Sequence, residues 1–359
     1  MKIEAKKVDC PGCGAYLVYD VDRLSCHYCG YERKLDLVPY TLDYRKFKNY
    51  TFSKADLEFG CPSCSATFDV PDNMYSGFCP YCDTPLLGEF LNEFRYRSFI
   101  PFEISHDEAG RLLKEKIGSL WFAPNDFKSF FKNYKELKAY YFPAWIFRFG
   151  CYVNYRGKRG EDYFVTRRVY INGKVKNVTQ RETRWYPVSG ELNLNFNDVL
   201  NISFLDVPQQ IRYFSFDVSR SVKSIEEAFS GEIGYEYNIE PVASFEAVKA
   251  YVEGDIRAAI RRDIGGDRQL ISDIGRKFYD VEMDGLFVPV YWGSVKWRDR
   301  EYNYFINGQT GQVVGERPYS WVKIAFAIIG TIALIVITIL LLQYFGVLDD
   351  ELGKSLLIY

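Results

Sequence analysis

Four Cys-x-x-Cys pairs within the first 82 residues constrain this chain more than any other feature. Two residues between cysteines let a tight turn aim both sulfurs at one ion, and two such turns make a cage of four thiolates. The expected first site is Cys10, Cys13, Cys26 and Cys29, and the second is Cys61, Cys64, Cys79 and Cys82. We therefore predict two structural Zn²⁺ ions, with iron or an empty site as the alternatives.

An even number of cysteines in a short secreted chain would instead indicate disulfides. The N-terminal sequence MKIEAKKVDC has no apolar stretch of the kind found in signal peptides, so we expect a reducing, cytosolic environment. Four thiolates leave no position for a substrate water, which favours zinc that stabilises a small module over zinc that catalyses. His27, inside the second pair, is an alternative ligand, but a surface position is favoured because thiolates already fill the shell.

The cysteine pattern also organises the chain. Cys10-Pro-Gly-Cys13-Gly-Ala and Cys61-Pro-Ser-Cys64-Ser-Ala begin two copies of one small module, a tandem repeat. We expect zinc ribbon 1 at 1–40, a linker at 41–54, zinc ribbon 2 at 55–97, α+β units at 98–230 and 231–320, a transmembrane helix at 321–346 and a short far-side tail at 347–359. The expected fold class is α+β with a β-rich middle.

The middle of the chain is rich in aromatic residues, which favour strands. We predict strands at 140–155, 163–171, 174–186, 277–283, 286–297 and 301–306, with hairpin turns at Asn172-Gly173 and Asn307-Gly308. These aromatic runs are interpreted as β-core and not as platforms for stacking bases.

Helices are predicted at 106–118, where Ser105 and Glu108 form a capping-box pattern, from Pro124 onward, and at 241–262. Phe142-Pro-Ala-Trp145 and Val288-Pro-Val-Tyr291 hold similar places after the two longer helices. A duplicated α+β unit is one interpretation, although the identity between the two halves is weak.

Ile324 to Leu342 is a stretch of 19 residues without a charge. At a rise of about 1.5 Å per residue it spans roughly 30 Å, the thickness of a bilayer core. A buried core helix is the alternative. Arg317 and Lys323 precede the stretch, and Asp349, Asp350 and Glu351 follow it. Because positive residues stay inside, we expect a single-pass membrane protein with its N-terminal bulk in the cytosol.

No catalytic constellation stands out, and we predict that the chain is not an enzyme. The two histidines are His27 and His106, and neither a P-loop nor a Gly-x-Ser-x-Gly elbow occurs. Asp263 and Asp267 flank two glycines, where a cation site or a helix-stop turn could form, and the turn is favoured. Cys151 is expected to be a buried, inert thiol and not a nucleophile.

Charge argues against nucleic acid as the partner. The chain carries a net charge of −2, and residues 1–97 hold 12 Lys and Arg against 14 Asp and Glu. Proteins that bind nucleic acid normally have a basic excess on the binding face. A membrane-tethered nucleic-acid-binding protein therefore remains the alternative to a protein-binding role.

Several motifs together resemble a family of bacterial membrane proteins with transcription factor IIB (TFIIB)-type zinc ribbons. They include the doubled Cys-Pro-x-Cys start, Phe142-Pro-Ala-Trp145, Asp263-Ile-Gly-Gly-Asp267, Asn307-Gly-Gln-Thr-Gly311 and Gly315-Glu-Arg-Pro-Tyr-Ser320. The resemblance implies an adaptor or scaffold in membrane stress or remodelling. It also implies partners related to flotillin-like (SPFH) proteins and phage-shock protein A. The sequence predicts no oligomeric state.

Overall fold

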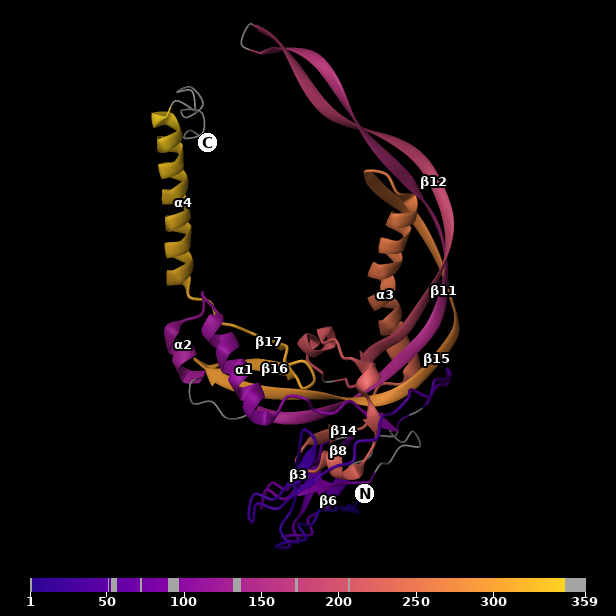
Figure 1. Cartoon of the computed structure of the whole chain (residues 1–359), viewed down its shortest axis with the longest axis vertical. Helices are drawn as coiled ribbons and strands as arrows, with labels where there is room; N and C mark the ends of the chain where they lie inside the picture. Colours follow the sequence, from indigo (N-terminus) through magenta and orange to yellow (C-terminus); the bar gives the residue numbers. More distant parts are fainter. Residues whose placement is uncertain are drawn as a thin grey trace. The chain divides into compact units, whose positions relative to one another are not determined.

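The computed structural model describes residues 2–50, 52, 57–71, 73–89, 97–131, 137–171, 174–205 and 207–345 (Figure 1). The chain forms two compact units. The first contains Met1–Ser105, Lys138–Tyr291 and Asn307–Thr310, and the second contains His106–Leu137, Trp292–Ile306 and Gly311–Tyr359. The duplicated α+β unit stays a prediction. The tail at 347–359 and the turn at Asn172-Gly173 lie outside the described residues.

The two cysteine-rich modules each contain a small antiparallel sheet. The first consists of β2 (Val18–Asp20), β3 (Arg23–Ser25) and β4 (Glu32–Lys34), and the second is built on β6 (Leu57–Gly60) and β7 (Thr67–Val70). The first strand of the chain, β1 (Lys2–Glu4), pairs in parallel with β6. The second module therefore takes its third strand from the start of the chain.

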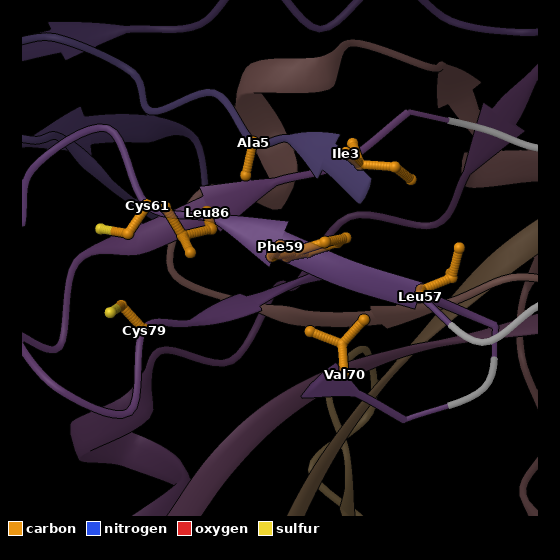
Figure 2. Close-up of a cluster of buried hydrophobic side chains, with 8 residues drawn as sticks. All are labelled: Ile3, Ala5, Leu57, Phe59, Cys61, Val70, Cys79 and Leu86. Atoms are coloured by element: carbon orange, nitrogen blue, oxygen red, sulfur yellow. The ribbon is translucent and has the colours of Figure 1, made fainter. Parts of the chain in front are cut away.

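The core of the second module depends on that strand. Figure 2 shows Ile3 and Ala5 reaching the same buried cluster as Phe59, and this cluster also includes the first cysteine of each pair in the second site. The cluster consists of Ile3, Ala5, Leu57, Phe59, Cys61, Val70, Cys79 and Leu86. Burial of these apolar groups supplements the small core that a metal site alone provides.

A larger sheet is dominated by three long strands: β11 (Leu137–Ile171), β12 (Lys174–Ile202) and β15 (Arg268–Trp297). β11 and β12 form one antiparallel ladder from Ala144↔Ile202 to Ile171↔Lys174, with a register shift between Phe147 and Phe149. The β-rich middle is confirmed. The separate strands predicted at 140–155 and 163–171 are wrong in extent, because they are parts of one continuous strand.

Short strands complete this sheet and connect it to the second module. β11 pairs with β14 (Ile233–Tyr235), which pairs with β8 (Met74–Phe78), and β8 pairs with β9 (Pro85–Leu87). β10 (Ser98–Phe99) lies between β13 (Val222–Lys223) and β15. β5 (Arg45–Lys46), in the segment expected as a linker, pairs with Met283 and Glu282 of β15. Short 3₁₀ helices η2 (Gln209–Tyr213), η3 (Val218–Arg220) and η4 (Glu226–Phe229) lie between β12 and β14.

The long helix α3 (Pro241–Ile264) packs against β12. Its buried stripe contains the predicted residues Phe245, Val248, Val252, Ile256 and Ile260. Apolar side chains at three- and four-residue spacing share one helix face, and burying that face holds the helix on the sheet. The helix predicted at 241–262 is confirmed.

The second unit contains α1 (His106–Ser119), α2 (Asn125–Phe130), the hairpin of β16 (Arg300–Asn307) and β17 (Val313–Gly315) apart from its turn at Asn307–Thr310, and α4 (Trp321–Tyr344). The helices expected at 106–118 and after Pro124 are confirmed. Asn307 lies at the predicted turn, where its side-chain oxygen accepts hydrogen bonds from the N–H groups of Gln309 (2.9 Å) and Thr310 (3.1 Å). An Asx turn of this kind closes a hairpin without requiring a left-handed residue at Gly308.

Candidate metal centres

Each of the four cysteine pairs folds into the same knuckle. The N–H of the leading cysteine donates to the carbonyl five residues later, and the N–H four residues later donates back to the cysteine carbonyl. In the first knuckle these bonds are Cys10 N–Ala15 O at 2.7 Å and Gly14 N–Cys10 O at 2.9 Å. The same pair of bonds recurs at Cys26, Cys61 and Cys79, all between 2.8 and 3.0 Å. The repeated turn explains why both members of each pair face one point.

The sulfur positions fit a tetrahedral zinc ion. Within each site the four Sγ atoms lie within 4.8 Å of one another. Cys10 and Cys29, like Cys13 and Cys26, are 3.6 Å apart, and the corresponding pairs of the second site are 3.7 Å apart. A Zn–S bond of about 2.3 Å in tetrahedral geometry places sulfurs about 3.8 Å apart, whereas a disulfide requires about 2.05 Å. In the described part of the chain, the four cysteines of each predicted site lie together.

At Cys82 a local hydrogen bond favours the thiolate form that metal binding requires. Thr84 Oγ1 lies 3.2 Å from Cys82 Sγ, and its hydrogen bond lowers the pKa of Cys82 to about 6. In every knuckle the leading cysteine is buried and the second cysteine is exposed. A bound zinc would therefore be anchored from the module interior and capped by the two outer sulfurs.

The two sites share a left-handed backbone position but place different residue types there. The residue that follows the second cysteine of each knuckle is left-handed, with φ of 74° at Gly14 and 73° at Gly30. In the second site the same position is held by Ser65 (φ 58°) and Asp83 (φ 57°). Glycine takes this conformation without a steric penalty, whereas Ser and Asp pay one. The second site is thus the more strained of the two.

Hydrogen bonds tie the start of the chain to the second module and tie the first module to another part of the first unit. Lys6 and Leu87 exchange two backbone hydrogen bonds of 2.8 Å. The N–H of Tyr19 donates to the Ser230 carbonyl at 2.7 Å, and Ser230 Oγ donates to the Leu17 carbonyl at 2.7 Å. The sequence left open whether the ribbons pack together. In the structure, both modules belong to the first unit and are hydrogen-bonded within it.

The other residues considered in the sequence have structural roles. His27 is exposed and lies outside the four-sulfur group. Tyr155 donates to the Asp263 carboxylate, and the Asp267 carboxylate accepts from the Asp162 N–H at 2.9 Å. Gly265, at φ 64°, ends α3, as the turn interpretation predicts. Cys151 is buried in the sheet, and burial raises the pKa of its thiol.

Asp284 and Glu232 are among the buried acids that were not found from the sequence. Asp284 accepts hydrogen bonds from the N–H groups of Asp43 and Gly285, both at 2.8 Å. Glu232 is also buried, and no described group donates to its Oε2. Burial raises the pKa of Glu232 well above its usual range. A single acid in an apolar run gives no periodic signal, so only the packed structure identifies these groups.

The apolar helix α4 is long and apolar enough to cross a membrane. It runs for 24 residues, its most apolar 18-residue stretch has a mean hydropathy of 3.0, and none of its residues is buried. Its only charge is Lys323 in the first turn, whose Nζ bonds to the Ala123 carbonyl at 2.8 Å and to Asn125 Oδ1 at 2.7 Å within the second unit. A core helix would be covered by protein, so this exposure favours a lipid environment.

Comparison with known proteins identifies no family. No protein-family model and no solved structure matches the chain. The chain is similar to the uncharacterized protein YdjG of Bacillus subtilis (strain 168), with 22% identity over 334 residues, covering 88% of this chain and 91% of that protein. The similarity assigns no activity to the chain.

Proposed function

We propose that this protein is a membrane-anchored, non-enzymatic adaptor that presents two zinc ribbons to protein partners at the cytosolic face. The observation that carries the proposal is the closed geometry of both metal sites. Four cysteine sulfurs per site satisfy a tetrahedral zinc and leave no position for a substrate. Bound zinc would make each module rigid, because its cysteine ligands would hold the knuckles in place.

The knuckle tips offer a matched pair of contact residues. Tyr28 and Tyr81 occupy the same position in their knuckles, one residue before the last cysteine, and each is 70% exposed. Tyr28 packs edge-on against Tyr16 with centroids 5.6 Å apart, and Tyr81 packs against Phe68 at 6.3 Å. Exposed, pre-ordered tyrosines are typical anchors of protein interfaces, because little entropy is lost when they are buried.

The resemblance found in the sequence suggests the class of partner. We infer that flotillin-like (SPFH) or phage-shock-type proteins are held at the membrane by this chain during membrane stress or remodelling. The apolar helix α4 would supply the anchor. The proposal concerns recruitment, and it assigns no reaction to the chain.

Affinity purification from gently solubilised membranes tests this proposal. The full chain, the double variant Tyr28→Ala/Tyr81→Ala and the control Tyr251→Ala are compared, because Tyr251 on α3 is equally exposed at 70%. We expect flotillin-like or phage-shock-type proteins with the full chain and the control, and their loss with the double variant while zinc is retained. Equal recovery with all three would exclude the knuckles as the docking surface. Nuclease-sensitive nucleic acid in place of protein would favour the alternative, a tethered nucleic-acid-binding protein.

A further inference from the structure

The end of the β11–β12 hairpin extends beyond the elements that support its base. Within the first unit, β15 begins at Arg268, whose Nε lies 3.2 Å from a carboxylate oxygen of Asp162, and α3 ends at Ile264. Residues 163–171 and 174–182, here called the distal ribbon, pair strand to strand past that point (Figure 1). Its nine residues on β11 reach roughly 30 Å at about 3.3 Å per residue.

Both faces of the distal ribbon expose large apolar side chains. Phe164 and Tyr170 are 74% and 77% exposed, and Val175 and Val178 are 54% and 40% exposed. Tyr170 and Val175 pair across the strands beside the turn, so the apolar side chains reach the far end of the hairpin. The aromatic runs were expected in the core, and that prediction is wrong for the distal ribbon, because no described element covers this part of the sheet. Such exposure in a soluble segment indicates an interaction surface.

The distal ribbon is also strongly basic. It contains five Lys and Arg and one Glu, a net charge of +4 in a chain whose total is −2. Arg167 pairs with Glu182 at 2.6 Å, and Arg181 pairs with Asp162 at the base. Arg168 lies between these pairs and the apolar end, and it is exposed. This concentration of positive charge in the distal ribbon favours an anionic partner.

We propose that the distal ribbon binds an anionic lipid bilayer, with its apolar end in the interfacial region and its Lys and Arg side chains on lipid phosphates. Tyr, Phe and aliphatic side chains beside Lys and Arg residues suit the membrane region between the headgroups and the acyl chains. Nucleic acid fits less well, since the exposed valines offer no stacking surface for bases. This inference goes beyond recruitment and rests only on α4 holding the chain at a bilayer.

Photocrosslinking in vesicles tests the proposal on the full chain. Tyr170 is replaced by the photoreactive residue p-benzoylphenylalanine, and the protein is reconstituted into phosphatidylcholine vesicles with or without about one-third phosphatidylglycerol. Tyr251 on α3, labelled in the same way, reports on non-specific lipid contact. Mass spectrometry measures the lipid adduct, and flotation of the vesicles measures insertion of α4 separately. We expect an adduct at Tyr170 that requires phosphatidylglycerol and little adduct at Tyr251.

Two variants separate binding from folding. Arg167→Gln/Arg168→Gln removes two distal charges, whereas the control Arg156→Gln/Lys158→Gln removes two charges nearer the base of the same strand. Each basic residue near an anionic surface strengthens binding by roughly fivefold, so we expect the distal variant to lose about tenfold or more of the adduct and the control to keep most of it. Val175→Ser, at an exposed site, should also lower the yield. Equal adducts at Tyr170 and Tyr251, no adduct at Tyr170, or transfer of the crosslink to added double-stranded DNA would each overturn the proposal.

Discussion

Ser65 and Asp83 hold left-handed backbone where the first metal site has Gly14 and Gly30. An L-residue in this conformation costs about 1–2 kcal/mol, and part of that cost is offset because glycine gains more entropy on unfolding. We therefore predict that Ser65→Gly stabilises the second module by roughly 0.5–1 kcal/mol and slows zinc release to a chelator. Gly14→Ala should destabilise the first module by a similar amount. Faster zinc release from Ser65→Gly than from the unaltered chain would contradict this account.

Glu232 makes stability depend on pH. Its carboxyl has an ordinary pKa of 4.5, which burial and the nearby charge of Asp20 raise in the folded protein. Above about pH 4.5 the unfolded chain releases this proton while the folded chain keeps it. The free energy of unfolding therefore falls as pH rises, by up to about 1.4 kcal/mol per pH unit, until the folded carboxyl also ionises.

Glu232→Gln tests that assignment, because glutamine has a similar shape and does not ionise. We predict that the variant is more stable than the unaltered chain at pH 7 and that the difference shrinks toward pH 4.5. Chemical denaturation of the full chain in detergent across this range provides the measurement. The same pH slope in both proteins would show that another group is responsible.

At the scale of elements, β1 joins the start of the chain to the second module. Ile3 is 5% exposed and pairs with Phe59 of β6 (Figure 2). Ile3→Ala should lower the stability of the second module by about 2–5 kcal/mol, because a buried branched side chain is replaced by a methyl group. Lys2→Ala removes only an exposed ion pair with Glu4, and it should change stability by less than about 0.5 kcal/mol.

Hydrogen exchange locates the effect of Ile3→Ala. Amides of β6 and β7 should lose protection in the variant, while amides of β2 and β3 keep theirs. If the first module lost protection before the second, the pairing of β1 with β6 would not be the source of the stability.

Local patterns predicted some elements well. The four knuckles follow from Cys-x-x-Cys spacing with adjacent turn residues, and α3 follows from one apolar stripe that ends at Gly265. Both depend on residues that are close in sequence. The Asn307 turn was also predicted, because an Asn side chain closes a turn through its own neighbours.

The features that were not predicted depend on packing between residues far apart in sequence. Gly157 and Gly160 resemble strand breakers in sequence, yet β11 continues through both. A side chain at Gly157 would meet the backbone carbonyl of Leu270 on β15, and one at Gly160 would lie 2.8 Å from Thr183. Glycine at these positions permits close approach within the sheet. The pairing of β1 with β6 and the burial of Glu232 likewise join residues far apart in sequence, where no periodic pattern reports them.

At the scale of the whole molecule, one chain combines two four-cysteine modules with one apolar helix. The metal sites and α4 lie in different compact units, so evidence for one does not establish the other. A measurement of the central claim must therefore report on both together in the full-length protein.

The most direct measurement is the metal content of full-length protein that remains in membranes after an alkaline carbonate wash. Protein held by α4 stays in the membrane pellet, and elemental analysis of the purified pellet fraction gives the ratio of zinc to chain. The account predicts two zinc ions per chain, one for each four-cysteine group. Release of the protein into the wash, or pelleted protein with iron or without zinc, would contradict it.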